Sequence, residues 1–349
     1  MLTSWHEARH WPVAPDRRLH SATHEEIIQG ATADIYWFKT LAILDDLGLA
    51  DTVVGAEVFA RKHGVVAGVA EVQGLLRDAA GHIEVLSLAE GETFSPGEPI
   101  MQIRGPYRAF GPYETALLGI LASASGWATA AREIKEAAGD SPVISFGARH
   151  VHPAVAPVME RAALVGGCDG ASCILAARLM GQRPVGTIPH ACVLIAGDTL
   201  TVARTYDALM PADEPRIILV DTFKDEAEES LRVAQAMGRA LAGVRLDTPR
   251  ERGGVTPELV REIRARLDQQ GFGHVSIFCS GGMNPEKIAA LKAAGAGGFG
   301  VGSYISGAKP IDMTMDVLEV AGEPRAKRGR IPGMKSNPRL RPLPLNQPG

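Results

Sequence analysis

The sequence predicts an α/β protein in which an α+β N-terminal domain precedes an incomplete α/β barrel of about seven strands. In the second half, short apolar runs end in polar or glycine clusters and alternate with helical patterns. Residues 52–107 instead carry short β-rich runs broken by Gly, Pro and Asp. The 349 residues suit two domains of ordinary size. We therefore expect an N-terminal domain over 1–140, a barrel over 141–309, and a C-terminal segment, 310–349, that packs back on the first domain.

Composition excludes several classes of protein. The chain is 46% apolar and 22% charged, which is typical of a globular protein. Its net charge of -4 gives no case for a nucleic-acid partner, so any positive site must be local. No signal-peptide core is present, and no apolar run reaches the ~18 residues of a membrane span. We expect a soluble, cytoplasmic protein without a membrane partner. The four cysteines are Cys168, Cys173, Cys192 and Cys279, and they lack CxxC or metal-ligand spacing. Three of the four lie in apolar surroundings, so we expect buried free thiols.

The N-terminal elements follow from local patterns. Residues 1–20 have no periodicity and are predicted to form an irregular arm, whereas 23–49 show helical spacing. The turn 95–98 predicts a hairpin that brings Phe94 and Ile100 into pairing range. An Ala- and Leu-rich helix is expected over 114–138. The predicted β-rich runs are 53–60, 64–76, 82–88 and 99–105.

Strand and helix patterns alternate after Pro142. Helices are clearest over 225–241 and 257–270, where Thr256 is a predicted cap and Pro257 the first helical residue. Seven strand signals indicate a barrel short by one unit, or one with an unrecognised strand. A doubly wound sheet is the alternative, because alternation does not determine closure. The predicted strands are 143–147, 168–171, 184–188, 216–221, 243–247, 274–280 and 297–301.

Chargeable side chains follow several of these strands, where an α/β barrel builds its active site. Asp169, Asp221 and Asp247 could bind sugar hydroxyls, hold Mg²⁺ or stabilise a positively charged sugar carbon. Each could instead cap the next helix. Arg149 and Arg245 could oppose phosphate or carboxylate, although surface arginines are common.

Two glycine-bearing turns follow the last strands of the predicted barrel. Glycine lets backbone N–H groups approach a phosphate closely, and a helix start adds a favourable dipole. Tight turns alone would also explain these glycines, but two such turns in this order favour a phosphate site. The turns comprise Ser280, Gly281 and Gly282, and Gly300 to Gly302 with Ser303.

Histidines give a weaker signal. His150 and His152 share a face of an extended segment, but no further ligand stands at clear metal spacing, so no bound metal site is predicted. His190 ends a predicted strand on the same rim and is the histidine expected to act in catalysis. The other reading is that lone histidines are structural.

Eight motifs in order give the chain a specific resemblance. They are Asp34-Ile35-Tyr36, Phe146-Gly147-Ala148-Arg149 with His152-Pro153, GGCDGAS, GTIPHA followed by Gly197-Asp198, LVDTF, VRLD, CSGGM and FGVGS. Over about residues 21–335 the chain resembles the nicotinate phosphoribosyltransferase family. That resemblance implies the type II phosphoribosyltransferase fold, a β-rich domain beside an incomplete barrel.

The resemblance also implies a reaction and its site. Nicotinate and phosphoribosyl pyrophosphate would give nicotinate mononucleotide and pyrophosphate in NAD biosynthesis, with Mg²⁺ on the pyrophosphate and ATP hydrolysis as an optional coupled step. Phe146 and a second subunit's Tyr36 would sandwich the pyridine, so a homodimer or higher homo-oligomer is expected. The remaining implied roles are catalysis by His190, Asp221 and Asp247; substrate binding by Arg149, His152, Asp169, Thr187 and Arg245; and phosphate binding by Ser280, Gly281, Gly282, Gly300, Gly302 and Ser303. His190 stands where ATP-using relatives carry a phosphorylated histidine.

Two alternatives remain. A related enzyme could use nicotinamide, quinolinate or another pyridine acid, but quinolinate has two carboxylates and calls for more basic residues than Arg149, His150 and His152 provide. The second alternative is a non-catalytic phosphosugar-binding regulator, which the full set of rim residues disfavours. The residues around His150 and Ser172 depart from the family pattern, so recognition of the ring substituent is open. The C-terminus lacks the cysteines of a metal-binding module, and no structural zinc is expected.

Overall fold

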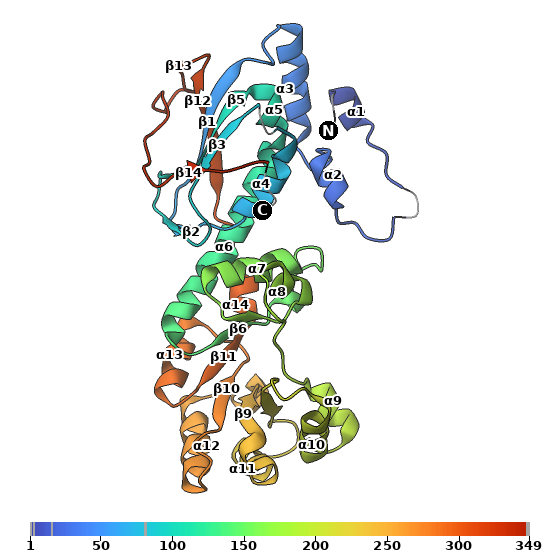
Figure 1. Cartoon of the computed structure of the whole chain (residues 1–349), viewed down its shortest axis with the longest axis vertical. Coiled ribbons are helices and arrows are strands. Elements are labelled where there is room, and N and C mark those ends of the chain that lie inside the picture. The colour runs from blue at the N-terminus through green and yellow to red at the C-terminus, as the bar shows by residue number, and fades with distance from the viewer. Residues whose placement is uncertain (1, 3, 15–16, 80–81, 347–349) are drawn as a thin grey trace. The chain divides into compact units, whose positions relative to one another are not determined.

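The computed structural model describes residues 2, 4–14, 17–79 and 82–346. The chain divides into two compact units, one of Met1–Thr129 with Lys309–Gly349 and one of Ala130–Ala308 (Figure 1). Each unit has its own sheet. Among the described helices, none combines the length and the apolar character that crossing a bilayer requires.

The first unit is built on a six-stranded antiparallel sheet with the order β13-β12-β1-β5-β3-β14. Strands from near the C-terminus therefore complete a sheet begun by the N-terminal half. The tail also donates from Asn337 Nδ2 to Pro99 O (2.9 Å) and from Lys335 N to Glu57 Oε2 (3.1 Å). The strands are β1 (Val53–Ala60), β3 (Glu84–Ser87), β5 (Pro99–Pro106), β12 (Met313–Val320), β13 (Glu323–Pro324) and β14 (Arg341–Pro342), with β2 (Gly64–Val65) and β4 (Thr93–Phe94) as a separate pair.

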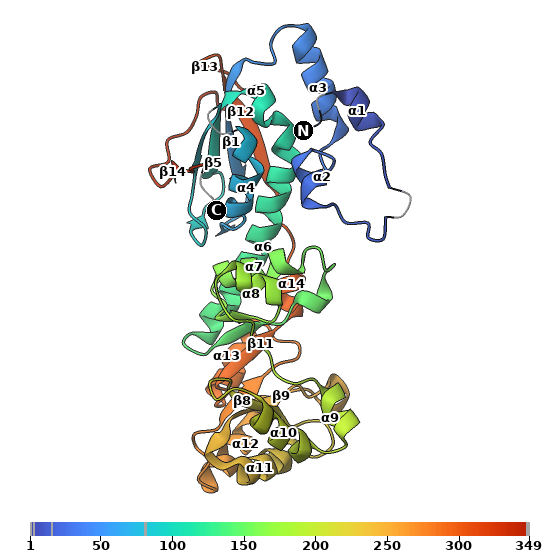
Figure 2. The same cartoon turned by 45° about the vertical axis from the view of Figure 1, so that its right-hand side comes forward.

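The core of this unit lies between the sheet and two helices. Figure 2 shows α4 (Val69–Leu75) and α6 (Glu114–Ala138) beside the sheet. Apolar side chains of α4 and of the N-terminal part of α6 form one core with buried residues of β1, β3 and β5. The bounds of α6 confirm the helix predicted over 114–138. The other helices are α1 (Trp5–Arg9), α2 (His24–Ile28), α3 (Ile35–Asp46) and α5 (Tyr107–Phe110).

The N-terminal helices differ from the sequence prediction. The expected irregular arm contains α1, which Ser4 caps by accepting from Glu7 N (3.2 Å). The single helix expected over 23–49 is two helices, because the chain turns at Gly30 with φ +88°. The Ile-rich pattern continued across this break, so apolar spacing alone did not reveal it.

Two β predictions in the first unit were also wrong in part. The run 64–76 contains only the short β2 and then α4, whose buried residues recur at helical spacing, and a continuous apolar run does not distinguish the two states. The turn at 95–98 is confirmed, with Glu98 N donating to Ser95 O (3.1 Å). Phe94 and Ile100 do not pair across it, because β4 pairs with β2 whereas β5 pairs with β1 and β3.

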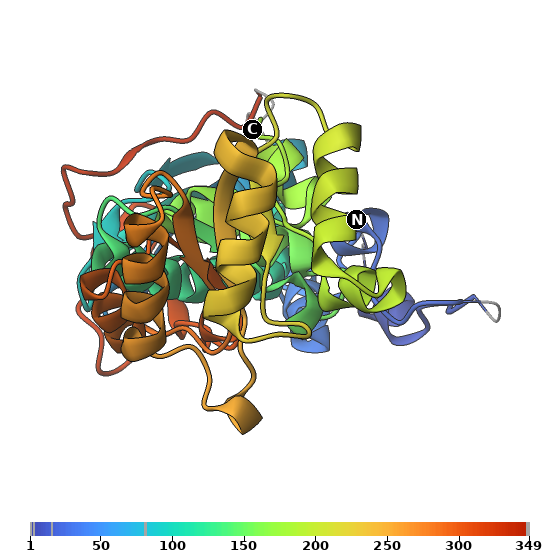
Figure 3. The ribbon, with the colours of Figure 1, turned by 90° about the horizontal axis from the view of Figure 1, so that it is seen from below.

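The second unit holds a curled parallel sheet with the order β7-β6-β11-β10-β9-β8. Its helices lie outside the strands, and Figure 3 shows α11 between α10 and α12. Thr256 caps α12 by accepting from Leu259 N (3.3 Å), which confirms that predicted start. The strands are β6 (Val143–Ser145), β7 (Gly170–Ala171), β8 (Arg216–Leu219), β9 (Leu241–Leu246), β10 (Ser276–Cys279) and β11 (Gly298–Val301); the helices are α7 (Ala156–Gly166), α8 (Ile174–Leu179), α9 (His190–Ala196), α10 (Thr199–Leu209), α11 (Glu226–Met237), α12 (Pro257–Gln269), α13 (Pro285–Ala293) and α14 (Ser303–Ser306).

The sheet is an open barrel rather than a closed one. Strands β7 and β8 are consecutive along the chain but form opposite edges of the sheet. The strand predicted over 184–188 would occupy this gap, but the segment is not a strand, so the sheet has six strands instead of seven. Pro184 and Pro189 lack the N–H groups that a sheet ladder needs, and Val185 N alone of this segment donates to β7, to Ala171 O (2.9 Å).

Candidate active site

The carboxyl ends of the parallel strands meet around one pocket within the second unit. Register brings Ser145 beside Val301 and Leu246 beside Cys279, so the residues after these strands share one rim. The pocket has a volume of about 370 Å³, a size suited to a small-molecule ligand. It is lined by Phe146, Arg149, His150, Ser172, Gly186, Thr187, Pro189, His190, Arg245, Asp247, Ser280, Gly281, Gly282, Gly300, Gly302 and Ser303.

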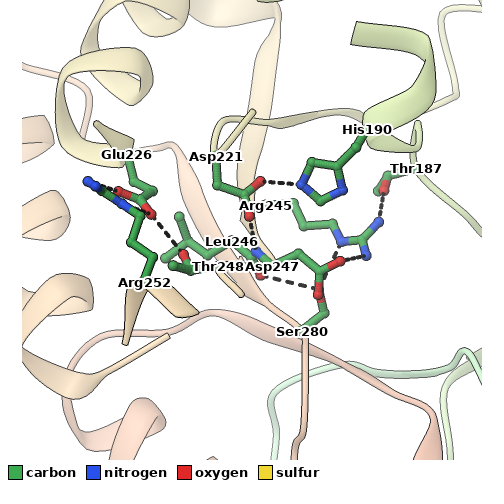
Figure 4. A network of polar contacts seen from close by, with 10 residues as sticks. All are labelled: Thr187, His190, Asp221, Glu226, Arg245, Leu246, Asp247, Thr248, Arg252 and Ser280. Atoms are coloured by element: carbon green, nitrogen blue, oxygen red, sulfur yellow. Dashed lines mark hydrogen bonds and ion pairs between the residues drawn. The ribbon is translucent and has the colours of Figure 1, made fainter. Parts of the chain in front are cut away.

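Arg245 lies at the centre of a polar network in this pocket (Figure 4). Its guanidinium donates to Thr187 Oγ1 (2.7 Å), Ser280 Oγ (3.0 Å) and Asp247 Oδ2 (3.1 Å). Burial lowers the pKa of Arg245, against the effect of the neighbouring aspartates. The side chain is held in one position by these contacts, so it presents a fixed cation to the pocket.

Phe146 lies next to that cation. The Arg245 guanidinium carbon lies 5.2 Å from the centre of the Phe146 ring, within cation–π distance. The ring fits against β11 because position 300 is glycine: a Cβ there would lie 2.4 Å from Phe146 Cε2. Gly300 is therefore explained by aromatic packing, whereas the sequence suggested a phosphate contact.

Asp221 links His190 to the backbone of Asp247. Its Oδ1 lies 3.1 Å from His190 Nε2, and its Oδ2 accepts from Asp247 N (3.0 Å). The Asp221 side chain is only 1% exposed, and burial raises its pKa. Asp247 in turn accepts from Ser280 Oγ (3.0 Å) and Arg245, so two aspartates of neighbouring strands are rigidly positioned at the rim.

The two glycine turns line the pocket with residues whose backbone N–H groups lack a partner on the described backbone. Gly281 and Gly282 have φ values of +85° and +60°, the left-handed region that glycine favours. In the described part of the chain, the N–H groups of Gly281, Gly282 and Gly302 have no backbone acceptor. Lys287 Nζ donates to Gly281 O (3.1 Å) and fixes the first turn. Free N–H groups on such turns form an anion-binding concavity.

Two residues expected at the site, Asp169 and His152, lie elsewhere, and Tyr36 was expected to come from a second subunit. Asp169 was expected on the rim, but it precedes β7, accepts from Val143 N (2.8 Å) and pairs with Lys135 Nζ (2.8 Å). It therefore lies at the amino end of the sheet, and the expectation was wrong. His152 is exposed, accepts from Ala154 N (3.1 Å) and does not line the pocket. Tyr36 is 49% exposed and belongs to the first unit, where its ring contacts Trp37 at 4.5 Å.

Sequence reasoning left several lining residues without a role. Ser172 directly follows β7 and His150 lies in the loop after β6, which was the available signal. Gly186 lies in the segment predicted as a strand, and Pro189 directly follows that segment. His150 Nε2 accepts from Arg149 Nε (3.4 Å), so its Nδ1 is the nitrogen that donates to Ser306 Oγ (3.2 Å). This chain of contacts holds His150 and Arg149 beside the second glycine turn.

Among the described residues, cysteine and acidic side chains do not gather into a metal site. Cys168 and Cys279 are buried, and burial raises the pKa of each thiol to about 12; Cys173 is half-buried and Cys192 exposed, so fewer are buried than expected. In the part of the chain that the structure describes, no group of three His, Cys, Asp or Glu side chains could hold a metal ion. The four carboxylate oxygens of Asp221 and Asp247 all have protein partners.

The chain matches family models and solved structures of known proteins. Family models of the quinolinate phosphoribosyl transferase N-terminal and C-terminal domains match residues 34–125 and 127–316. A crystal structure of nicotinate-nucleotide pyrophosphorylase from Pyrococcus furiosus is 43% identical, with a TM-score of 0.86 over 95% of this chain and 87% of that one.

Curated relatives carry a second name. Nicotinate phosphoribosyltransferase pncB1 of Mycobacterium tuberculosis is 29% identical over 91% of this chain and 78% of its own length. The crystal structure of human nicotinic acid phosphoribosyltransferase, 22% identical, shares the fold with a TM-score of 0.67 over 86% of this chain and 77% of that one. The relatives thus carry the names of two related transferases.

Proposed function

We propose that this chain, which belongs to the quinolinate phosphoribosyl transferase family, is a phosphoribosyltransferase that acts on nicotinate. It would transfer the phosphoribosyl group of phosphoribosyl pyrophosphate to the pyridine nitrogen. The nitrogen lone pair forms a bond to ribose C1, the bond from C1 to pyrophosphate breaks, and pyrophosphate leaves with that electron pair. The products are nicotinate mononucleotide and pyrophosphate.

The observation that carries the choice of nicotinate is the ring end of the pocket. Phe146 offers an aromatic face, and Arg245 lies 5.2 Å from its centre. A pyridine stacked on Phe146 would place one carboxylate against Arg245 and Thr187. This assigns Arg245 to the carboxylate, whereas the resemblance implied that Arg245 contacts phosphate. A neutral carboxamide would gain less from this cation, so nicotinamide is the weaker acceptor.

The rest of the pocket suits phosphoribosyl pyrophosphate. The N–H groups at Gly281, Gly282 and Gly302, together with the Ser303 hydroxyl, would cradle the 5-phosphate. Asp247 would accept from the ribose hydroxyls, and Asp221 would stabilise positive charge that develops at C1. Arg149 lines the same pocket and would attract the pyrophosphate.

Mg²⁺ fits this site only together with the substrate. Since the oxygens of Asp221 and Asp247 already have partners, the ion would be held chiefly by pyrophosphate oxygens and water, with these aspartates nearby. When bound, Mg²⁺ would neutralise charge on the leaving pyrophosphate.

Quinolinate is the second candidate acceptor, supported by the family description and by the name of the Pyrococcus furiosus structure. The two carboxylates of quinolinate, together with the 5-phosphate and the pyrophosphate of phosphoribosyl pyrophosphate, would need more cations than the pocket offers. The basic side chains that line it are Arg149, His150, His190 and Arg245.

The decisive test compares kcat/KM for nicotinate, nicotinamide and quinolinate with phosphoribosyl pyrophosphate and Mg²⁺. We expect nicotinate to be preferred at least 10-fold over either rival. Asp247→Asn, which removes a charge without changing shape, is the inactive control. Preference for quinolinate with CO₂ release would overturn the choice of acceptor, and no mononucleotide from any pyridine would overturn transferase activity.

ATP coupling is a separate proposal that rests on His190, held by Asp221 at 3.1 Å. Incubation with ATP should raise the protein mass by one phosphate and stimulate turnover, and His190→Ala should abolish both effects. An ATP-independent rate would contradict this proposal without affecting the first.

Tyr36 is proposed to cover the acceptor ring in a second copy of the chain. Its 49% exposed ring leaves it available for such a contact. Mixing inactive Tyr36→Ala and Asp247→Asn chains under conditions of subunit exchange should restore part of the activity. Exchange without recovery would rule out a shared site.

A further inference from the structure

A buried carboxylate lies behind the pocket. Glu160, on α7, is 0% exposed and does not line the pocket itself. It accepts from Ala148 N (3.1 Å), Cys173 N (2.6 Å) and Ser172 Oγ (3.2 Å). Three donors converge on its two oxygens, which is the arrangement that satisfies an ionised carboxylate in an interior. Glu160 thereby connects the loop after β6 to the loop after β7.

The contact with Glu160 determines what Ser172 can offer a ligand. A serine hydroxyl has one proton and two lone pairs. Because an ionised Glu160 only accepts, the Ser172 proton is committed to it, at 3.2 and 3.4 Å from the two oxygens. Ser172 lines the pocket, so it presents lone pairs to the ligand and no donor.

Ser172 belongs to the ring end of the pocket. Its N–H donates to Ser145 O (3.1 Å), which places it beside the residue that precedes Phe146. Val185 N donates to Ala171 O (2.9 Å), so the segment that leads to Thr187 passes next to Ser172. The Ser172 hydroxyl, which can only accept hydrogen bonds from a ligand, therefore lies near the aromatic face of Phe146 and near the Arg245–Thr187 pair.

The geometry points to Glu160 as a positioning residue that, acting through Ser172, excludes a second carboxylate on the pyridine ring. This inference rests on the proposed function. A monocarboxylate directs its charge at Arg245 and leaves the Ser172 edge to ring C–H groups. A pyridine-2,3-dicarboxylate would place its second charge near hydroxyl lone pairs backed by a buried anion, which is unfavourable where water is excluded. The pair thus sets specificity by rejection rather than by attraction.

The test measures kcat/KM for quinolinate divided by kcat/KM for nicotinate on each variant. Glu160→Gln removes the charge and provides an amide N–H, so the Ser172 hydroxyl can accept from it and turn its proton toward the pocket. We expect this ratio to rise at least 10-fold, and the inhibition constant of quinolinate against nicotinate to fall in parallel. Ser172→Ala removes the lone pairs and should raise the ratio about threefold.

Controls separate specificity from folding. Cys173→Ser keeps the backbone N–H that Glu160 accepts and should leave the ratio unchanged. Thermal unfolding checks each variant, and Ser172→Ala, at a half-buried position, carries the test if Glu160→Gln does not fold. A ratio within twofold of the native value in the folded variants, or a parallel loss for both acceptors, would overturn the inference. A native preference for quinolinate would instead overturn the proposed function.

Discussion

Asp169 and Asp221 both adjoin strands of the same parallel sheet, and they lie at opposite ends of it. Asp169 precedes β7, is 43% exposed and pairs with Lys135. Asp221 follows β8, is 1% exposed and contacts His190 and the backbone of Asp247. The first has the contacts of a structural ion pair, whereas the second belongs to a buried network on the pocket rim. The position of a carboxylate along its strand, rather than its charge, decides which role it can take.

The largest expected effect comes from Asp221→Asn. The change keeps the shape of the side chain but removes the charge that faces His190 and the developing positive charge at C1. We expect kcat/KM for the transferase reaction to fall at least about 100-fold with little change in Tm. Steady-state kinetics and thermal unfolding measure both. If kcat/KM stayed within threefold of the native value, Asp221 would not take part in the reaction.

Gly300→Ala tests the packing that positions the ring end. A Cβ would lie 2.4 Å from Phe146 Cε2, so the aromatic face must move. We expect KM for the acceptor to rise about 10-fold and stability to fall by about 1–3 kcal/mol. Gly119→Ala is the matched control, because a Cβ at that helical position meets nothing within 4 Å and should be neutral or slightly stabilising. An unchanged KM in Gly300→Ala would mean that Phe146 does not contact the acceptor.

Glu114 tests whether burial of a carboxyl group affects stability outside the site. Burial, with Asp316 and Asp34 nearby, raises its pKa from 4.5 to about 7. Between these values the folded state binds a proton that the unfolded state has released, so the free energy of unfolding falls as pH rises from about 4.5 to about 7.

Glu114→Gln should remove that pH dependence. We expect the variant to be more stable than the native protein by about 1–2 kcal/mol at pH 8 and about equal to it at pH 4.5. Denaturant unfolding at the two pH values measures the difference. Equal destabilisation at both would show that Glu114 is not protonated in the folded state at neutral pH.

The smallest effect is expected from Asp169→Asn. The change weakens the ion pair with Lys135 but keeps an oxygen that can accept from Val143 N. We expect stability to fall by about 0.2–1 kcal/mol, the usual range for a partly exposed pair, with kcat and KM unchanged. A 10-fold loss of kcat/KM would show that Asp169 contributes to the reaction, and it would contradict a purely structural role for this residue.

Much of this molecule follows from its sequence alone. Patterns local to a few residues predicted α6, the capped start of α12 and the strands that precede Asp221, Asp247 and Ser280. The matching order of motifs predicted the family. Such features depend on apolar spacing, caps and turn residues, which act between near neighbours in the chain.

Only the tertiary structure decided the remaining features. The sequence could not show that the Pro-flanked segment 184–188 leaves the barrel open, because strand formation depends on a partner edge. Asp169 precedes β7, and its pairing with Val143 and Lys135 places it at the amino end of the sheet rather than on the rim. Gly300 against Phe146, and Glu160 against Ser172, are contacts between residues far apart along the chain. Close packing and the pairing of buried polar groups determine such contacts, and both depend on neighbours that only the folded chain supplies.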